Sequence, residues 1–440
     1  MRPTDALPHP ESWATTTVGR SIDLKRGVSW SKDQEHAEPG IDRVPVIGIG
    51  NVQKTLELDN LLYLSGLKPA VVKKKRVTAG WTVMVGSNGN RARIGNAAIV
   101  RDDADFLFAS FLLGAKPKSN SGLSPEYFYR WLSSEQAQAY LSASSEGTTG
   151  LNNLSNSFFR AMTIPVPPPD EQAPIGRILN AVDVTLERAC AAADRAKELD
   201  HALLHELLEQ GLSPSSEVRR KYPSHWLVKR VDQVAEVGSG VTMGTDVSGH
   251  KSVELPYLRV ANVQDGRLDL SIIKTVRVRV DEVESYSLVP GDVLMTEGGD
   301  LDKLGRGTMW RGEIENCLHQ NHIFRIRADR AMLEPEFFSL VVESDIAKRY
   351  FNRVAKRTTN LASTNKTQVR AFQFPVPPTN DEQRDIVAIM KASKGALAGL
   401  EAKIAAVGRL KSSLMYDLLT GRIRTNMLVG TNMLAEAMAL

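Results

Sequence analysis

The chain has 440 residues, of which 42% are hydrophobic and 24% charged, and basic residues outnumber acidic ones only slightly, 55 to 51. A chain of this length can bury more than one core, so we expect two or three domains, and the near balance of charge says little about partners. No run of about 18 uncharged apolar residues could cross a bilayer, and Met1–Pro10 lacks the apolar segment of a secretory signal, so we expect a cytoplasmic protein with no membrane partner.

Residues 1–168 have the pattern of a mixed α/β domain. Short apolar runs typical of strands, such as Val44–Ile49, precede a Gly-rich turn at Gly86–Gly95. A helix then opens with Pro125 in its first turn, where the missing N–H costs nothing. We expect the following Pro165-Val-Pro-Pro to stop any regular element and to lead, through Asp-Glu-Gln, into a long helix.

Residues 169–212 are predicted to form that long helix. Apolar side chains recur at alternating spacings of four and three from Ile175 to Leu207, with one polar interruption at Asp200. A sustained heptad favours pairing with another helix, although local packing on the helix's own domain explains it as well.

The second half of the chain repeats the first at a nearly constant offset. Pro375-Val-Pro-Pro follows its first occurrence by 210 residues, and Asn262-Val-Gln follows Asn51-Val-Gln by 211. Trp226 repeats Trp13 at an offset of 213. Shared turn chemistry explains single matches of this kind but not a collinear series, so we infer a duplication.

The duplication predicts a second set of the same elements. Residues 213–378 should form a second mixed α/β domain, with its helix opened by Pro335, and residues 379–424 a second long helix. The apolar stripe of that helix is interrupted once, at Lys411. The fold class is therefore α/β in the α+β sense, with two repeated domains separated by two long helices that pair. Residues 425–440 lie outside the repeat and have no predicted role.

The sequence offers little for catalysis. It has no GxxxxGK[ST] loop and no Asn/Asp-Pro-Pro-aromatic tetrapeptide, the motif with which amino-methyltransferases grip an adenine. His201 and His205 have the spacing of zinc ligands, but no third ligand is evident and an acidic helix surface explains them better. Cys190 and Cys317 have no metal-ligand spacing. We therefore predict a non-catalytic chain that binds no metal and no cofactor of its own.

Binding features are more informative, because basic residues cluster. The acid-free segments Leu61–Arg101 and 346–380 are basic, whereas Asp183–Gly211 carries seven acids against three bases. The first basic segment contains a compact cationic run, which is either a solvated loop or a phosphate-binding site: Lys73, Lys74, Lys75 and Arg76.

The Gly-rich hairpin after this run carries amides and guanidinium groups. Asparagine can pair bidentately with adenine, and arginine with guanine. The candidate DNA-reading residues of the first hairpin are Ser87, Asn88, Asn90, Arg91 and Arg93, and those at the same place in the second repeat are Lys303 and Arg306. The glycines recur while the polar residues differ, as expected if the repeats read different sequences.

A second loop near the end of each repeat is the other candidate. Hydroxyls, amides and cations before a helix start suit phosphate contacts that set register, although helix capping explains the Thr and Asn residues equally well. The candidates are Thr148, Thr149 and Asn152 in the first repeat, and Lys356, Arg357, Thr358, Thr359 and Asn360 in the second.

The combination resembles the specificity subunits of type I restriction-modification enzymes. Each repeat ends in Pro-Pro, Glu-Gln and a long helix, and the helices close in Leu-Leu and Gly, at Leu207–Gly211 and Leu418–Gly421. The resemblance covers residues 10 to 424. It implies two target recognition domains, each binding half of a bipartite DNA sequence, and an antiparallel coiled coil between them with a pseudo-twofold axis.

The resemblance also implies partners. Double-stranded DNA and two methyltransferase subunits are expected, with restriction or translocase subunits as a further addition. S-adenosylmethionine, ATP and Mg²⁺ would then be bound by those partners. A stand-alone repressor with two DNA-binding halves is the alternative, and a self-contained methyltransferase is disfavoured by its missing motifs.

An antiparallel pairing sets a register for the helices. If Ile175 faces Leu418, Lys411 lies beside Asp183, and Asp200 lies beside Lys394. We expect ion pairs at both places that fix the register, unless the polar interruptions simply face solvent.

Overall fold

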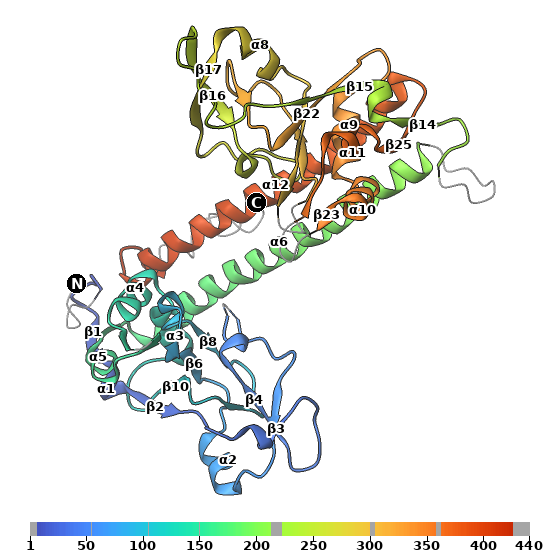
Figure 1. The fold of residues 1–440 in the computed structure, drawn as a ribbon. Coiled ribbons are helices and arrows are strands. Elements are labelled where there is room, and N and C mark those ends of the chain that lie inside the picture. The colour runs from blue at the N-terminus through green and yellow to red at the C-terminus, as the bar shows by residue number, and fades with distance from the viewer. Residues whose placement is uncertain are drawn as a thin grey trace. The chain divides into compact units, whose positions relative to one another are not determined.

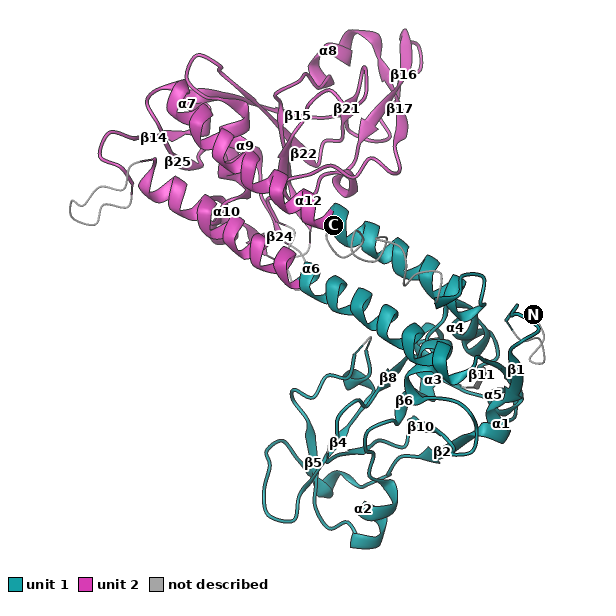
Figure 2. Ribbon diagram, turned by 180° about the vertical axis from the view of Figure 1, so that it is seen from behind, with its two compact units in different colours: residues 1–190, 402–440 teal, residues 191–401 magenta. Residues whose placement is uncertain are grey.

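The computed structural model describes residues 7–53, 55–103, 105–148, 150–212, 222–299, 304–357 and 362–425. It divides into two compact units, coloured separately in Figure 2. Unit 1 comprises Met1–Cys190 with Ala402–Leu440, and unit 2 comprises Ala191–Glu401. Each unit thus contains one repeat together with parts of both long helices.

Unit 1 is built on a four-stranded antiparallel sheet, the central sheet of this unit, in the order β2-β10-β6-β8. The residues of β6 are all buried, as expected for an inner strand with β-branched side chains. The strands are β2 (Ile22–Arg26), β6 (Thr82–Val85), β8 (Ala97–Ile99) and β10 (Leu112–Pro117).

Three smaller sheets complete unit 1. One pairs β1 (Ala14–Thr17) with β13 (Thr163–Val166). Another has the order β3-β5-β4-β9, from β3 (Glu35–His36), β4 (Val44–Ile47), β5 (Leu62–Leu64) and β9 (Leu107–Phe108). The last has the order β11-β12-β7, from β7 (Ser87–Asn88), β11 (Glu146–Thr148) and β12 (Leu151–Asn153).

Two of the short helices of unit 1, α3 and α4, begin at a serine whose hydroxyl caps the helix. As predicted, α3 starts with Pro125, and the Ser124 hydroxyl accepts a hydrogen bond from the Tyr127 backbone N–H. The short helices are α1 (Val18–Ser21), α2 (Pro69–Lys75), α3 (Pro125–Leu132), α4 (Glu135–Ala143) and α5 (Asn156–Ala161).

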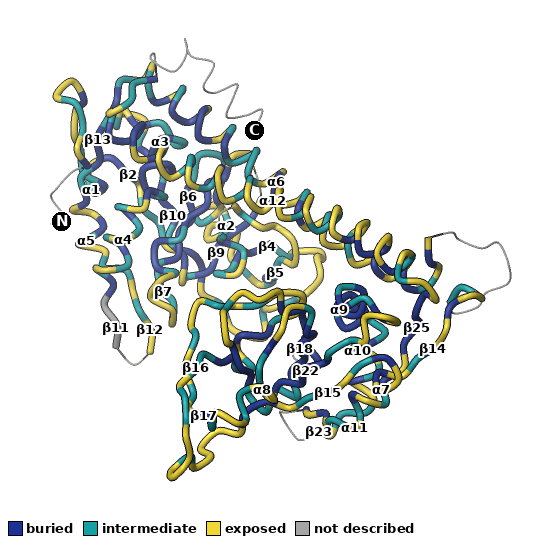
Figure 3. The backbone as a smooth tube through the Cα atoms, turned by 90° about the horizontal axis from the view of Figure 1, so that it is seen from above, coloured by how far each residue is buried: buried dark blue, intermediate teal, exposed yellow. Residues whose placement is uncertain are grey.

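Unit 2 repeats the sheet orders of unit 1, which confirms the predicted duplication. Figure 1 labels the elements of both units, and Figure 3 shows which parts of the chain are buried. Its central sheet has the order β15-β22-β18-β20, from β15 (Ala235–Ser239), β18 (Val293–Thr296), β20 (Gly307–Met309) and β22 (Ile323–Ala328). The smaller sheets use β14 (Leu227–Arg230), β16 (Ser252–Leu258), β17 (Lys274–Arg279), β19 (Gly298–Gly299), β21 (Leu318–His319), β23 (Lys356–Arg357), β24 (Ala362–Ser363) and β25 (Gln373–Val376). Its short helices are α7 (Val231–Val234), α8 (Val283–Tyr286), α9 (Pro335–Glu343), α10 (Asp345–Val354) and α11 (Lys366–Arg370).

Both predicted long helices are present, as α6 (Pro169–Gln210) and α12 (Asn380–Leu419). Within unit 1, Asp183 of α6 forms a 2.6 Å ion pair with Lys411 of α12, and within unit 2, Lys197 lies 3.3 Å from Glu401. A step forward along α6 is therefore a step backward along α12, which confirms the antiparallel pairing. The stripe residues near the helix ends also enter the domain cores, so pairing and local packing both occur.

The repeated Asp-Glu-Gln motif fastens each long helix to its domain. The Gln172 side chain is almost fully buried, donates to the Gly122 and Pro167 carbonyls, and accepts from the Ser124 N–H. Gln383 makes the equivalent three bonds in unit 2, to Met332, Pro377 and Glu334. A buried amide with all these partners is well suited to fixing where a helix leaves its domain.

Three expectations need correction. The Pro-Val-Pro-Pro stretch does not exclude regular structure, because Pro165 and Pro375 lie in β13 and β25. Each of these strands pairs with a neighbour on one side only, and an edge strand of this kind tolerates a proline, which has no N–H to donate. The cationic run is not a loop but the last turn of α2 and the residue after it. The predicted pair of Asp200 with Lys394 is absent, because Lys394 contacts Glu343 of α9 instead.

Candidate nucleic-acid interface

The central sheet of unit 1 has one end at which β2 and β6 finish and β8 and β10 begin. We call this the loop end. The predicted reading hairpin connects β6 to β8 and therefore lies there. In unit 2 the loop end is where β15 and β18 finish and β20 and β22 begin. The two repeats thus present corresponding loops at corresponding places.

In unit 1 the structure brings the two predicted loops together. Strand β12 pairs with β7, and the Ser87 hydroxyl donates to the Asn153 Oδ1 atom at 2.7 Å. The Asn152 side-chain amide donates to the Gly89 carbonyl at 3.0 Å. The hairpin and the second predicted loop, near the end of the repeat, therefore form one surface, which spacing along the sequence could not reveal. Thr148 contributes to it as a residue of β11, and Thr149 lies outside the described residues.

The side-chain oxygens of the hairpin asparagines already accept hydrogen bonds from the backbone of the hairpin. The Asn88 Oδ1 atom accepts from the Asn90 backbone N–H at 2.7 Å, and the Asn90 Oδ1 atom accepts from the Ala92 N–H at 3.0 Å. A bidentate contact with adenine needs both the oxygen and the amide of one asparagine. These side chains would have to share or release a loop hydrogen bond in order to read a base.

The two hairpin arginines differ in their surroundings. Arg91 donates to the carbonyls of Ser142 and Ala143 at the C-terminus of α4, a place that favours a cation. Arg93 is half-buried and donates to the Gln53 Oε1 atom at 3.3 Å. Backbone carbonyls thus hold Arg91, whereas the guanidinium of Arg93 is held, within the described part of the chain, by the Gln53 side chain.

Unit 2 supplies the corresponding surface from different residues. Strand β19 pairs with β24, which pairs with β23, and Arg306 donates to the Gln264 Oε1 atom at 2.9 Å. Lys356 and Arg357 are exposed in β23, with Arg357 also donating to the Asn352 carbonyl. The remaining predicted residues of this repeat lie outside the described part of the chain: Lys303, Thr358, Thr359 and Asn360.

The cationic run lies on α2, beside the edge strand β2. Lys73 and Lys74 are exposed, whereas Lys75 donates to the Arg26 carbonyl at 2.6 Å. Arg76 forms a 2.7 Å ion pair with Asp105. The four residues are therefore not equivalent, and Lys73 and Lys74 are the ones whose ammonium groups extend into solvent.

The loop end of unit 1 contains a cavity that sequence reasoning missed. Its volume is about 180 Å³, and its lining includes Arg26, Ser87, Phe111, Asn156 and Arg160. Phe111 is 50% exposed, which is unusual for a phenylalanine on a folded surface. In the sequence, the adjacent cations Lys25 and Arg26, which form the end of β2, are the signal that could have indicated it. Cations around an exposed aromatic ring suit a nucleic acid, which offers phosphates and flat bases.

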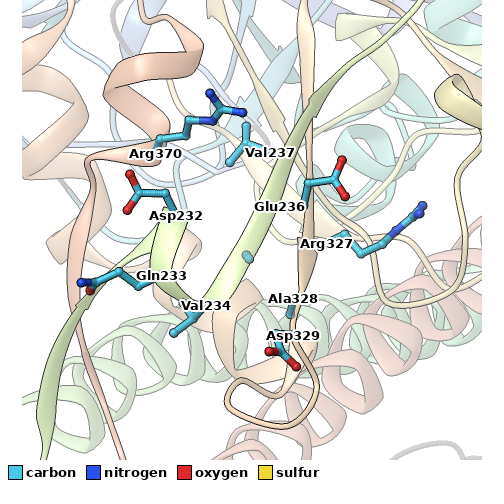
Figure 4. A pocket seen from close by; sticks show the side chains of 10 residues that line it. Asp232, Gln233, Val234, Glu236, Val237, Arg327, Ala328, Asp329 and Arg370 are labelled. Atoms are coloured by element: carbon cyan, nitrogen blue, oxygen red, sulfur yellow. The ribbon is translucent and has the colours of Figure 1, made fainter.

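A hollow on unit 2 is less suited to a ligand. Figure 4 shows its lining, which comes from α7, β15, β22 and α11. Its volume is about 630 Å³. Arg230 pairs with Asp232, and Asp292 pairs with Arg327, so the charges there are largely matched by neighbours.

The described residues do not support a metal site or a membrane-spanning helix. They contain no group of three or more His, Cys, Asp or Glu side chains that could hold a metal ion. His201 and His205 contact different carboxylates, those of Asp345 and Glu209. None of the helices in the described ranges is both long and apolar enough to span a bilayer.

Comparison with known proteins agrees with this geometry. The family model described as type I restriction modification DNA specificity domain matches twice, over residues 10–191 and 223–407. The StySPI specificity subunit of Salmonella potsdam is 23% identical over 386 residues, covering 86% of this chain and 81% of that protein. The EcoKI specificity subunit of Escherichia coli K12 is 24% identical over 388 residues, with the same coverage of each chain.

Solved structures share the fold. The S subunit of a type I restriction-modification system from M. genitalium aligns with a TM-score of 0.54 at 15% identity, over 95% of this chain and 99% of that one. A subunit from a structure of type I complex assembly and conformational transition aligns with a TM-score of 0.56 at 17% identity, over 94% and 99%. Because the family model matches both repeats and covers most of the sequence, this chain belongs to the type I restriction-modification DNA specificity family.

Proposed function

We propose that this chain recognises a split DNA sequence, with each unit reading one half, and that it directs adenine methylation by partner subunits without catalysing a reaction itself. One observation carries the proposal. The two units share the same sheets and helices, yet the polar side chains at their loop ends differ. A duplicated scaffold with different contact residues suits two different half-sites.

The partners follow from the family and from this chain's lack of catalytic motifs. Two methyltransferase subunits would supply S-adenosylmethionine, and restriction or translocase subunits would add ATP and Mg²⁺. Within the described residues, the arrangement offers hydrogen-bond donors and cations rather than a nucleophile beside a base. The chain's own task is then binding and orientation.

Reconstitution tests this proposal. The purified chain alone should neither methylate nor cut DNA, and it should confer sequence-specific methylation when mixed with its methyltransferase partner and S-adenosylmethionine. Methyl transfer by the chain alone would contradict it. Purification from the host addresses the repressor alternative, which expects the chain to bind its DNA without methyltransferase subunits.

A further inference from the structure

The repeated Asn-Val-Gln tripeptide has the same conformation in both units. Asn51 and Asn262 each end a short 3-10 turn, and each Oδ1 atom accepts a backbone N–H from the residue three positions earlier, at 2.9 and 2.8 Å. The following Val52 and Val263 are buried in their cores. Asparagine and valine therefore fix the turn, which leaves the role of the glutamine to be explained.

Each glutamine is oriented by its own amide. Gln53 donates to the Gly50 carbonyl and Gln264 to the Ala261 carbonyl, both at 2.8 Å. Because the Nε2 group is held in this way, the Oε1 atom points in one fixed direction. In both units an arginine donates to that oxygen, from the loop between β6 and β8 in unit 1 and from the loop between β18 and β20 in unit 2.

The two arginines do not occupy equivalent positions. Gly95 and Gly305 are equivalent, since both have positive φ. The side of each glycine on which a Cβ would lie packs against a corresponding helix, at Leu141 for Gly95 and at Phe351 for Gly305. Arg93 lies two residues before its glycine, whereas Arg306 lies one residue after its own. The contact with glutamine is thus kept while the position that supplies the arginine has changed.

We infer that Gln53 and Gln264 are positioning residues, each of which orients one DNA-contacting arginine at the loop end of its unit. This inference rests on the proposed function. An amide oxygen is neutral, so it directs a guanidinium without cancelling its charge. In unit 1 it occupies only part of the Arg93 side chain, which carries five N–H donors. The remaining donors suit the paired acceptors of a guanine edge or a phosphate.

A purely structural role for this contact predicts something else. A loop that needed an arginine for its own stability would keep it at one position, as it keeps its glycine. Arg91 shows what such a role looks like, because backbone carbonyls at the end of α4 hold it and no oriented side chain does.

Half-site discrimination is the decisive experiment. The full chain is assembled with its methyltransferase partner and assayed on duplexes that carry the split motif found by mapping methylated adenines in host DNA. A second set of duplexes changes one base pair at a time in each half. The variants are Gln53→Met, Gln264→Met, Arg93→Ala and the double variant Gln53→Met/Arg93→Ala. Methionine keeps the volume of glutamine and removes its fixed oxygen.

Gln53→Met should lower discrimination about 5- to 150-fold at one base pair of one half-site, the range for a lost bidentate contact. It should leave the other half-site unchanged, and Gln264→Met should do the reverse, so that each variant is the other's control. Arg93→Ala should match Gln53→Met, and the double variant should be no worse than either.

Three results would overturn the inference: equal weakening on every duplex, additive effects in the double variant, or unchanged discrimination. A wild-type assembly that treats all duplexes alike would instead overturn the proposed function, so the two failures are distinguishable.

Discussion

The two units place opposite charges in equivalent segments, and Lys73 and Glu284 occupy equivalent positions within them. In unit 1, α2 carries Lys73, Lys74 and Lys75, whereas the equivalent segment of unit 2, 211 residues later, carries Asp281, Glu282 and Glu284. Similarly, Asp183 of α6 is replaced at the equivalent position of α12 by Lys394.

The buried partners change sign along with the helix charges. Arg130 of α3 is 2% exposed and contacts Asp183, which also binds Lys411. In unit 2 the corresponding helix α9 offers Glu343, one turn further along, to Lys394. Both units therefore have an ion pair between corresponding helices, but it has moved by about one turn and its signs are exchanged. Packing dictates the scaffold, while a matched pair of charges can be exchanged for its opposite.

Removing the buried arginine of unit 1 should have the largest effect on stability. Arg130→Met leaves the carboxylates of Asp183 and Glu126 without their main partner, and losing one member of a buried pair costs about 3–5 kcal/mol. Denaturant unfolding of the full chain measures it. Arg101→Met is the matched control, because it removes an exposed partner of the same Glu126 and should cost about 1 kcal/mol or less. Equal losses in the two variants would contradict the account.

Acid should distinguish the units at a second buried position. Burial lowers the pKa of His319 to about 4, so the neutral ring is the folded form, and its equivalent in unit 1 is Phe108. The stability that depends on the neutral ring is complete above the unfolded pKa of about 6.5 and is lost as pH falls toward 4, by about 3 kcal/mol.

His319→Phe should therefore flatten the pH dependence of unfolding between those values. Titration of the unfolding midpoint from pH 7 to pH 4 provides the measurement, with His9→Phe at a less buried site as control. An unchanged slope in His319→Phe would show that other groups cause the acid sensitivity.

The exposed charges of the two units should differ in their effect on DNA affinity. Replacing Lys73 and Lys74 by glutamine should weaken binding to all sequences about tenfold, and the slope of log affinity against log salt should become shallower by up to about 2, because fewer counterions are released. Replacing Asp281 and Glu284 by their amides should not make that slope shallower. Binding titrations at several salt concentrations test both, and a change confined to one sequence would contradict a phosphate role.

The smallest difference concerns the polar interruptions of the two helices. Lys411 pairs with Asp183, so Lys411→Met should cost about 1 kcal/mol. Asp200, its equivalent, has a buried Oδ1 atom with no hydrogen-bond partner among the described residues, so Asp200→Asn should change stability by less than about 1 kcal/mol. Thermal unfolding of both variants compares the two losses. A larger loss in Asp200→Asn than in Lys411→Met would indicate that Asp200 does pair with Lys394, as the sequence predicted.

Much of the fold could be predicted because it depends on local pattern and on repetition. The heptad stripe and the Pro125 and Pro335 helix starts concern neighbours along one helix, and the constant offset carries each assignment to the second repeat. The strand within Pro-Val-Pro-Pro could not be predicted in this way. Whether a proline is tolerated depends on which side of its strand is paired, which is a tertiary property.

The candidate site shows the same limit. Residue type and Gly-rich spacing indicated the hairpin, but they could not indicate which side chains contact each other there. The long helices show the same limit, because the pairing of Lys394 with Glu343 rather than Asp200 depends on how α9 packs on α12. The contact between Gln53 and Arg93 joins residues that are 40 positions apart. The repeated Asn-Val-Gln was visible as a match between repeats, yet its use required the turn that orients the amide.

On our proposal, two equivalent units read two halves of one DNA target. Mapping methylated adenines across host DNA, with this gene intact and with it deleted, tests that claim most directly. The account predicts a motif of two defined halves separated by unspecified bases, present with the gene and absent without it. A methylation pattern that is unchanged by the deletion, or a lost motif that is short and continuous, would contradict it.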